Sequence, residues 1–80
     1  MHEYMLSDLR PGQRGAVAAV GGEPAMARRL ADLGLIPGTA VTCTALAPAG
    51  DPAAYLIRGA VIALRRRDAA RVALEGPPCR

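Results

Sequence analysis

Apolar residues recur at helical spacing in one stretch of the chain. Met26, Leu30 and Leu33 stand at positions i, i+4 and i+7, which predicts a short helix with a single buried apolar stripe. Pro24 suits the first position of this helix. Gly34 follows the stripe directly and can adopt the left-handed conformation that ends many helices, because it has no Cβ atom to clash. The stretch therefore predicts one helix with an abrupt stop.

Most of the remaining chain consists of short runs that are typical of strands. Between residues 39 and 46, Val41, Cys43 and Ala45 fall on one face and threonines on the other, which predicts a half-buried strand. Further strands are expected at 14–20, before the helix, and at 53–58, 61–65 and 71–75. The other residues expected to face the interior are Leu6, Leu9, Tyr55, Ile57, Ile62, Leu64, Val72 and Leu74.

Turn-forming residues separate these runs. Pro37 and Gly38 suit the two central positions of a type II turn, and Gly59 suits a tight hairpin. The segment 47–52 predicts an exposed loop, because four of its residues favour turns: Pro48, Gly50, Asp51 and Pro52. Short strands with such breaks cannot form a wide open sheet, whereas curling removes most free edges. We therefore expect a mainly β fold, a small barrel of about five short strands with one short helix after the first strand.

The length of the chain bounds its organisation. Eighty residues suffice for one domain with a small core. Residues 1–80 are thus expected to form a single domain with a structured core at about 4–75 and a frayed tail from Gly76. Two distant cysteines support neither a disulfide framework nor a zinc finger, and the N-terminal residues lack the apolar segment of a signal peptide. The expected location is the cytoplasm.

The available side chains exclude several classes of chemistry. His2 is the single histidine, so no Ser-His or Cys-His pair can form in a structured core. The chain has no lysine, which excludes nucleotide binding through a P-loop. His2, Glu3 and Cys79 are weak candidate metal ligands, suited to an adventitious site or one between chains. Cys43 is expected to be a small buried hydrophobe.

An arginine cluster is the first candidate surface for a partner. Arg65, Arg66 and Arg67 are adjacent in a chain of net charge +3, and they suit phosphate, an anionic lipid or an acidic protein surface. The alternative is a solvated strand end that is partly neutralised by Asp68. Nucleic acid is not the expected ligand, because no aromatic residues stand between the arginines to stack on bases.

A pair of apolar residues is the second candidate surface. Leu35 and Ile36 stand between the helix stop and the turn, where only one of the two readily points inward. The other would then be left for a partner. The alternative is that both pack across the open end of the barrel.

Several of these segments, taken in order, resemble the signature of the FeoA family. The resemblance covers about residues 6–74 and lies in Leu-Ala-Asp-Leu-Gly-Leu-Ile-Pro-Gly at 30–38, Ala-Pro-Ala-Gly-Asp-Pro at 47–52, Gly59, Ala63-Leu64-Arg65 and Asp68-Ala69. The early run Leu-Ser-Asp-Leu-Arg-Pro-Gly at 6–12, with Gly15, matches the start of the family as well. The residues that form this motif include Leu33, Gly34, Pro37, Gly38, Pro48, Gly50, Asp51, Pro52 and Gly59.

The resemblance implies a cytoplasmic SH3-like barrel that is a non-enzymatic accessory or regulatory protein of bacterial ferrous iron uptake. Its implied partner is a FeoB-type inner-membrane transporter, with the membrane contacted only peripherally, and self-association is left open. No tightly bound cofactor is expected, with at most weak binding of Fe²⁺ or another transition metal. The alternative is a metal-sensing SH3-like regulatory domain, akin to the C-terminal domain of iron-dependent repressors. That role needs several ligands converging on one site.

Overall fold

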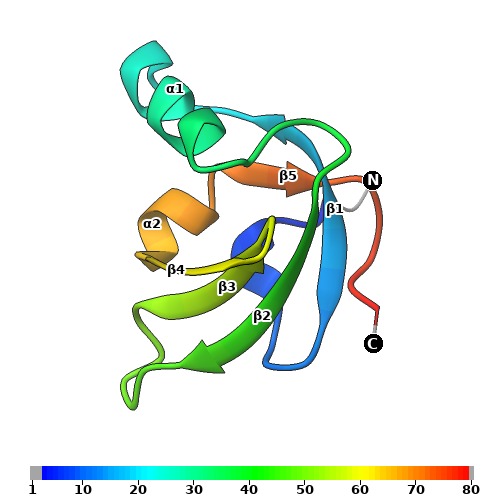
Figure 1. Cartoon of the computed structure of the whole chain (residues 1–80), viewed down its shortest axis with the longest axis vertical. Coiled ribbons are helices and arrows are strands. Elements are labelled where there is room, and N and C mark those ends of the chain that lie inside the picture. The colour runs from blue at the N-terminus through cyan, green and yellow to red at the C-terminus, as the bar shows by residue number, and fades with distance from the viewer. Residues whose placement is uncertain (1–2, 80) are drawn as a thin grey trace.

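The computed structural model describes residues 3–79. A short 3₁₀ turn, η1 (Leu6–Asp8), leads into strand β1 (Arg14–Val20) and helix α1 (Pro24–Asp32). The chain then forms β2 (Ala40–Leu46), β3 (Ala53–Ile57), β4 (Ala60–Leu64), the short helix α2 (Arg66–Ala69) and β5 (Val72–Leu74). The predicted mainly β fold, with its main helix after the first strand, is confirmed (Figure 1).

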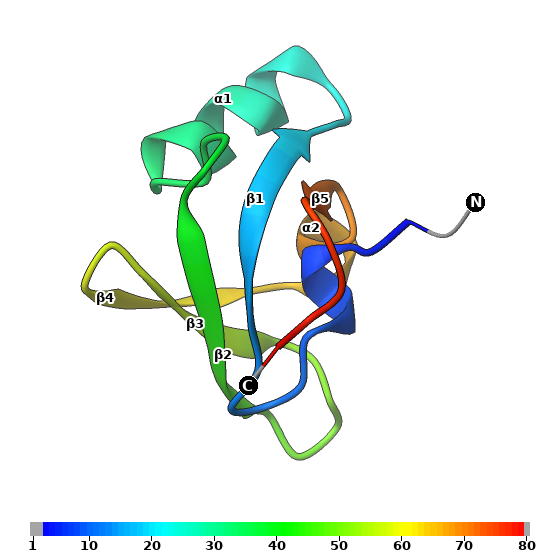
Figure 2. The same ribbon diagram turned by 90° about the vertical axis from the view of Figure 1, so that its right-hand side faces the viewer.

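The strands form one five-stranded sheet in the order β4-β3-β2-β1-β5, and every neighbouring pair is antiparallel. The sheet is strongly bent, so that β3 and β4 cross β1 at a steep angle in the second view (Figure 2). Helix α2 connects β4 and β5, the two edge strands, and lies beside η1. The sheet therefore curls around a single interior, as the short strands predict.

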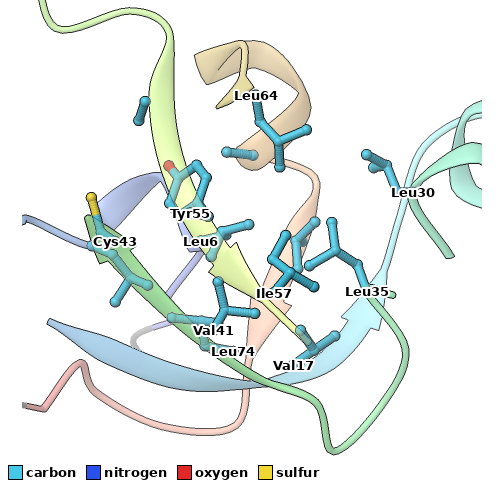
Figure 3. Packing of buried hydrophobic residues seen from close by; sticks show 14 residues of the cluster. Leu6, Val17, Leu30, Leu35, Val41, Cys43, Tyr55, Ile57, Leu64 and Leu74 are labelled. Carbon is cyan, nitrogen blue, oxygen red and sulfur yellow. The ribbon is translucent and has the colours of Figure 1, made fainter. Parts of the chain in front are cut away.

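Buried side chains from almost every element fill that interior (Figure 3). The predicted interior positions Leu6, Leu9, Tyr55 and Ile57 are among them. The full set is Leu6, Leu9, Val17, Leu30, Leu35, Val41, Cys43, Ala53, Tyr55, Ile57, Leu64, Ala69, Val72 and Leu74. Ile62, expected inside, is only partly buried against this cluster.

One strand position was predicted on the wrong face. Val41 and Cys43 are buried as expected, but Ala45 is exposed. The pairing with β3 shifts register between Cys43 and Ala45, which indicates a β-bulge. Because an extra residue reverses the alternation, Ala45 faces outward.

The predicted apolar stripe of the helix is also one residue too long. Leu30 is buried and Met26 is half-buried, but Leu33 is 39% exposed. Leu33 is the C-cap residue, where the chain leaves the helical path. Leu35, beyond the stop, is fully buried and packs in the core beside Leu30.

The C-terminal residues up to Cys79 lie against β1, where the sequence suggested a frayed tail from Gly76. The backbone N–H of Arg14 donates to the carbonyl of Cys79 at 2.6 Å, and the N–H of Cys79 donates to the carbonyl of Arg14 at 2.9 Å. The Glu75 N–H donates to the Ala16 carbonyl. Two prolines and a glycine at 76–78 suggested a loose end from sequence, but a free stretch of β1 supplies backbone partners.

Candidate partner-binding surfaces

The end of α1 has the geometry that the sequence predicts. Gly34 has a φ of +107°, and its N–H donates to the Ala31 carbonyl at 2.9 Å. The N–H of Leu35 donates to the Leu30 carbonyl at 3.1 Å, which completes a Schellman motif. Its apolar contact is supplied by Leu30 and Leu35, both in the core. The stop thus fixes the direction in which the next two residues point.

Those two residues divide as the sequence analysis expects. Leu35 is fully buried, so it is a core residue. Its assignment as a candidate partner contact was therefore wrong. Ile36 is 40% exposed and keeps an apolar surface toward solvent. The chain then reverses at Pro37 and Gly38, where the Thr39 N–H donates to the Ile36 carbonyl at 3.0 Å and Gly38 has a φ of +91°. A positive φ at this position is typical of the expected type II turn.

The loop between β2 and β3 has a role that was not predicted. The Oδ1 atom of Asp51 accepts a hydrogen bond from the backbone N–H of Arg66 at 2.9 Å. This N–H is at the start of α2, and the residue before it, Arg65, has no capping side chain. A carboxylate from another part of the chain therefore satisfies a free N–H of the helix. The turn that positions Asp51 is closed by the Gly50 N–H, which donates to the Ala47 carbonyl.

The three clustered arginines are all exposed, and they line two different hollows. Arg65 and Arg67 line a shallow depression with Asp51. Arg66 lines a different hollow, beside Tyr55. Asp51 lies beside Arg65 and Arg67 and accepts a hydrogen bond from the backbone N–H of Arg66, and within residues 3–79 the Oδ1 atom of Asp68 is buried without a hydrogen-bond partner.

The hollow beside Tyr55 has a volume of about 190 Å³. Its walls include polar groups from η1 and the residues after it, such as Asp8 and Arg10. Burial raises the pKa of the Tyr55 phenol to about 12, and the neighbouring Cys43 thiol contributes to the rise. Burial also raises the pKa of Cys43. Both groups therefore stay neutral at physiological pH, and the hollow is smaller than pockets that hold drug-sized ligands.

Of the three candidate metal ligands, the structure describes Glu3 and Cys79. Cys79 is exposed and pairs with β1, Glu3 is exposed near the N-terminus, and His2 lies outside the described residues. Between residues 3 and 79, no group of three or more His, Cys, Asp or Glu side chains is placed to hold a metal ion.

Sequence reasoning missed the outer face of the β3–β4 hairpin. Leu56 and Val61 are paired directly across these strands and are 39% and 64% exposed. The signal was present in the alternation of β3, where Tyr55 and Ile57 face inward and so place Leu56 outside. With Ile36 and the three arginines, this face completes the set of candidate surfaces.

These features define a small β-barrel whose exposed groups suit contact with a partner. In the described part of the chain, no helix has the length and apolar character to cross a membrane. A model of the FeoA domain matches residues 4–76, so the chain belongs to the FeoA family. The family is linked to ferrous iron transport.

Three relatives illustrate this membership. A fusion of Fe(2+) transport protein A and Fe(2+) transporter FeoB from Porphyromonas gingivalis is 33% identical over 70 residues, which are 88% of this chain but 8% of the fusion protein. The solution structure of a FeoA protein from Chlorobium tepidum has a TM-score of 0.82 at 38% identity, covering 89% of this chain and 68% of that one. The crystal structure of Stenotrophomonas maltophilia FeoA in complex with zinc, described as an SH3 domain protein, has a TM-score of 0.79 at 32% identity. The match covers 90% of this chain and 89% of that one.

The expected SH3-like barrel is thereby confirmed. A manganese-dependent transcriptional repressor has the same fold in part of its length, with a TM-score of 0.81 over 92% of this chain and 36% of the repressor. At 22% identity, that likeness concerns the fold alone.

Proposed function

We propose that this chain is a non-enzymatic accessory protein of ferrous iron uptake that acts by binding a FeoB-type transporter. The observation that carries the proposal is the fusion protein of Porphyromonas gingivalis, in which a segment similar to this chain is joined to such a transporter. Joining two modules in one chain raises their effective concentration, which helps where the separate modules act on each other.

The arginine cluster is the proposed electrostatic part of the surface that binds the transporter. Arg65, Arg66 and Arg67 are exposed, and one carboxylate, that of Asp51, lies beside Arg65 and Arg67. Guanidinium groups suit carboxylates on the cytoplasmic part of a transporter and the anionic lipid leaflet beside it. Ile36 adds an apolar contact at the other end of the barrel.

The test is the triple substitution of Arg65, Arg66 and Arg67 by Ala, assayed by titrating the full-length chain against the full-length transporter. Exposed charge pairs each contribute about 0.2–1 kcal/mol, so we expect binding to weaken about 10-fold at low salt and less at high salt. The thermal midpoint should hardly change, because the bond between Arg66 and Asp51 uses the backbone N–H.

A matched control removes the same charge elsewhere, by substituting Arg14, Arg28 and Arg29 with Ala. All three are exposed and lie on β1 and α1. Equal weakening by both triple variants would remove the cluster from the interface. A transporter that captures neither variant nor the unmodified chain would contradict the proposed function.

A further inference from the structure

Strand β4 leaves a free row of backbone groups at one edge of the sheet. It pairs with β3 alone, through a two-residue turn at Arg58 and Gly59, both of which have positive φ. In an antiparallel pair closed by such a turn, the hydrogen-bonded pairs alternate outward from Ile57 and Ala60. Val61 and Ala63 occupy the intervening pairs, so their N–H and C=O groups point away from β3.

The usual protections of an edge strand are missing here. Natural sheets protect edges with charges, proline, bulges or a covering segment. The sequence of β4 is Ala-Val-Ile-Ala-Leu, and its register with β3 is continuous over five pairs. Between residues 3 and 79, no hydrogen bond that joins separate elements involves Val61 or Ala63. Figure 2 shows the beginning of β4, next to the hairpin turn, at the left margin of the molecule.

The outer face beside this edge is apolar. Leu56 and Val61 face each other across β3 and β4, and Ala54 faces Ala63 in the next pair on the same face. A strand added at the edge would place the side chain opposite Val61 on this face, where it would extend the exposed apolar surface of Leu56 and Val61. Backbone hydrogen bonds and apolar contacts would thus act together, as in other cases of strand addition.

The charges at the two ends of β4 indicate which kind of strand would pair with its free edge. Arg58 precedes the strand, and the arginine cluster follows it. If a second copy paired antiparallel about Ile62, Val61 would meet Ala63, and the turn that holds Arg58 in each copy would lie toward the end of β4 from which the other copy's arginine cluster follows. Like charges placed opposite each other destabilise a strand pair. An extended segment with acidic residues at its ends, about 20 Å apart, would instead complement both ends.

We propose that the edge of β4 is a strand-addition site for an extended segment of a partner polypeptide, apolar in its middle and acidic at its ends. The inference rests on the proposed function only for the identity of the first partner to test, the transporter. The site itself is defined by Val61, Ala63 and the arginines around them.

The experiment is residue-resolved amide hydrogen exchange on the full-length chain, alone and with the full-length transporter. We expect the amides of Val61 and Ala63 to exchange rapidly in the free chain and at least 10-fold more slowly in the complex. Binding without slower exchange at these two amides would overturn the strand-addition site and leave the proposed function standing.

If the transporter does not bind, the same exchange measurement with a synthetic peptide, Glu-Thr-Val-Thr-Val-Thr-Glu, tests the strand-addition site. In that case the proposed function fails, but protection of the same two amides by the peptide still supports the site. The matched control is the peptide with Lys at both ends, which should bind at least 5-fold more weakly. Absence of protection by the acidic peptide, or equal binding of the two peptides, would overturn the inference.

Two variants at one position test the backbone contribution directly. Ala63→Pro removes an N–H that points away from β3, which an edge strand tolerates, and should weaken binding at least 10-fold. Ala63→Val keeps the N–H and should bind within about 2-fold of the unmodified chain. Equal binding by the two variants would contradict the use of this edge.

Discussion

The two edges of the sheet differ in how their backbone groups are satisfied. At the β5 edge, the Leu74 N–H donates to the Tyr4 carbonyl at 2.8 Å, and Ala73 forms a bridge with Met5. The chain before η1 therefore covers β5. At the β4 edge, Val61 and Ala63 have no such covering segment among the described residues. The β5 edge is covered by another segment of the chain, whereas the β4 edge lies open at the surface of the described structure.

The two edges differ in how much they contribute to the buried core of this small domain. Leu6, which follows the covering segment, is fully buried, as is Val72 of β5, and Leu74 of β5 is also a buried core residue. Covering the β5 edge thus also completes the core. The β4 hairpin buries only its inner face, and its outer residues Leu56 and Val61 contribute little to that core. Changes on the two sides should therefore have unequal effects on stability.

The largest expected effect comes from placing proline at the covered edge. Ala73 pairs with Ala19 of β1 and also with Met5, so Ala73→Pro breaks the ladder inside the sheet. We expect a loss of about 3 kcal/mol or more in the free energy of unfolding. Ala63→Pro, at the open edge, should cost less than about 1 kcal/mol. Urea denaturation of both variants measures the difference, and similar losses would contradict the contrast between the edges.

A smaller effect is expected where the end of α1 meets the turn of the β3–β4 hairpin. A Cβ atom at Gly34 would lie 2.8 Å from Cδ of Arg58 and 3.1 Å from Cγ2 of Ile57, at a φ of +107°. Gly34→Val should therefore cost about 2–3 kcal/mol, from backbone strain and forced contacts together. Gly50→Val is the matched control, because its φ is +87° but no atom lies within 4 Å of its Cβ position. Thermal melts with equal losses for both would show that contact with the hairpin is unimportant.

The smallest expected effect concerns the inner face of the same hairpin at high pH. The pKa of Tyr55 is raised to about 12 from an ordinary value of 10.0, so folding favours the neutral phenol. The contribution of the neutral phenol to the free energy of unfolding is complete below pH 10 and is lost as the pH rises toward 12. Between pH 9 and pH 11 the loss should be about 1 kcal/mol. Tyr55→Phe should remove this part of the pH dependence in urea denaturation, and an unchanged pH profile would contradict it.

Local sequence signals determined much of this fold. The α1 stop was predictable because Gly34 is needed for a positive φ, and the turns at Gly38 and Gly59 depend on the same property. Alternation placed Tyr55 and Ile57 inside because the side-chain period of a strand is two residues. These features depend on neighbours in sequence, so the sequence by itself was sufficient for the order of the five strands and the place of the main helix. For the pair Leu35 and Ile36, the sequence left open whether one residue or neither faces outward, and the structure places Ile36 outside.

Tertiary structure decided what depends on partners distant in sequence. Ala45 faces outward because the pairing of β2 with β3 contains a bulge, and Cys79 lies against β1 because β1 offers free backbone groups. Asp51 caps α2 across fifteen positions of sequence. The open edge of β4 was likewise hidden, because strand order determines which strand lacks a neighbour. Hydrogen bonds between distant segments have no period in the sequence, whereas helix stops and turns reflect the conformational preferences of single residues.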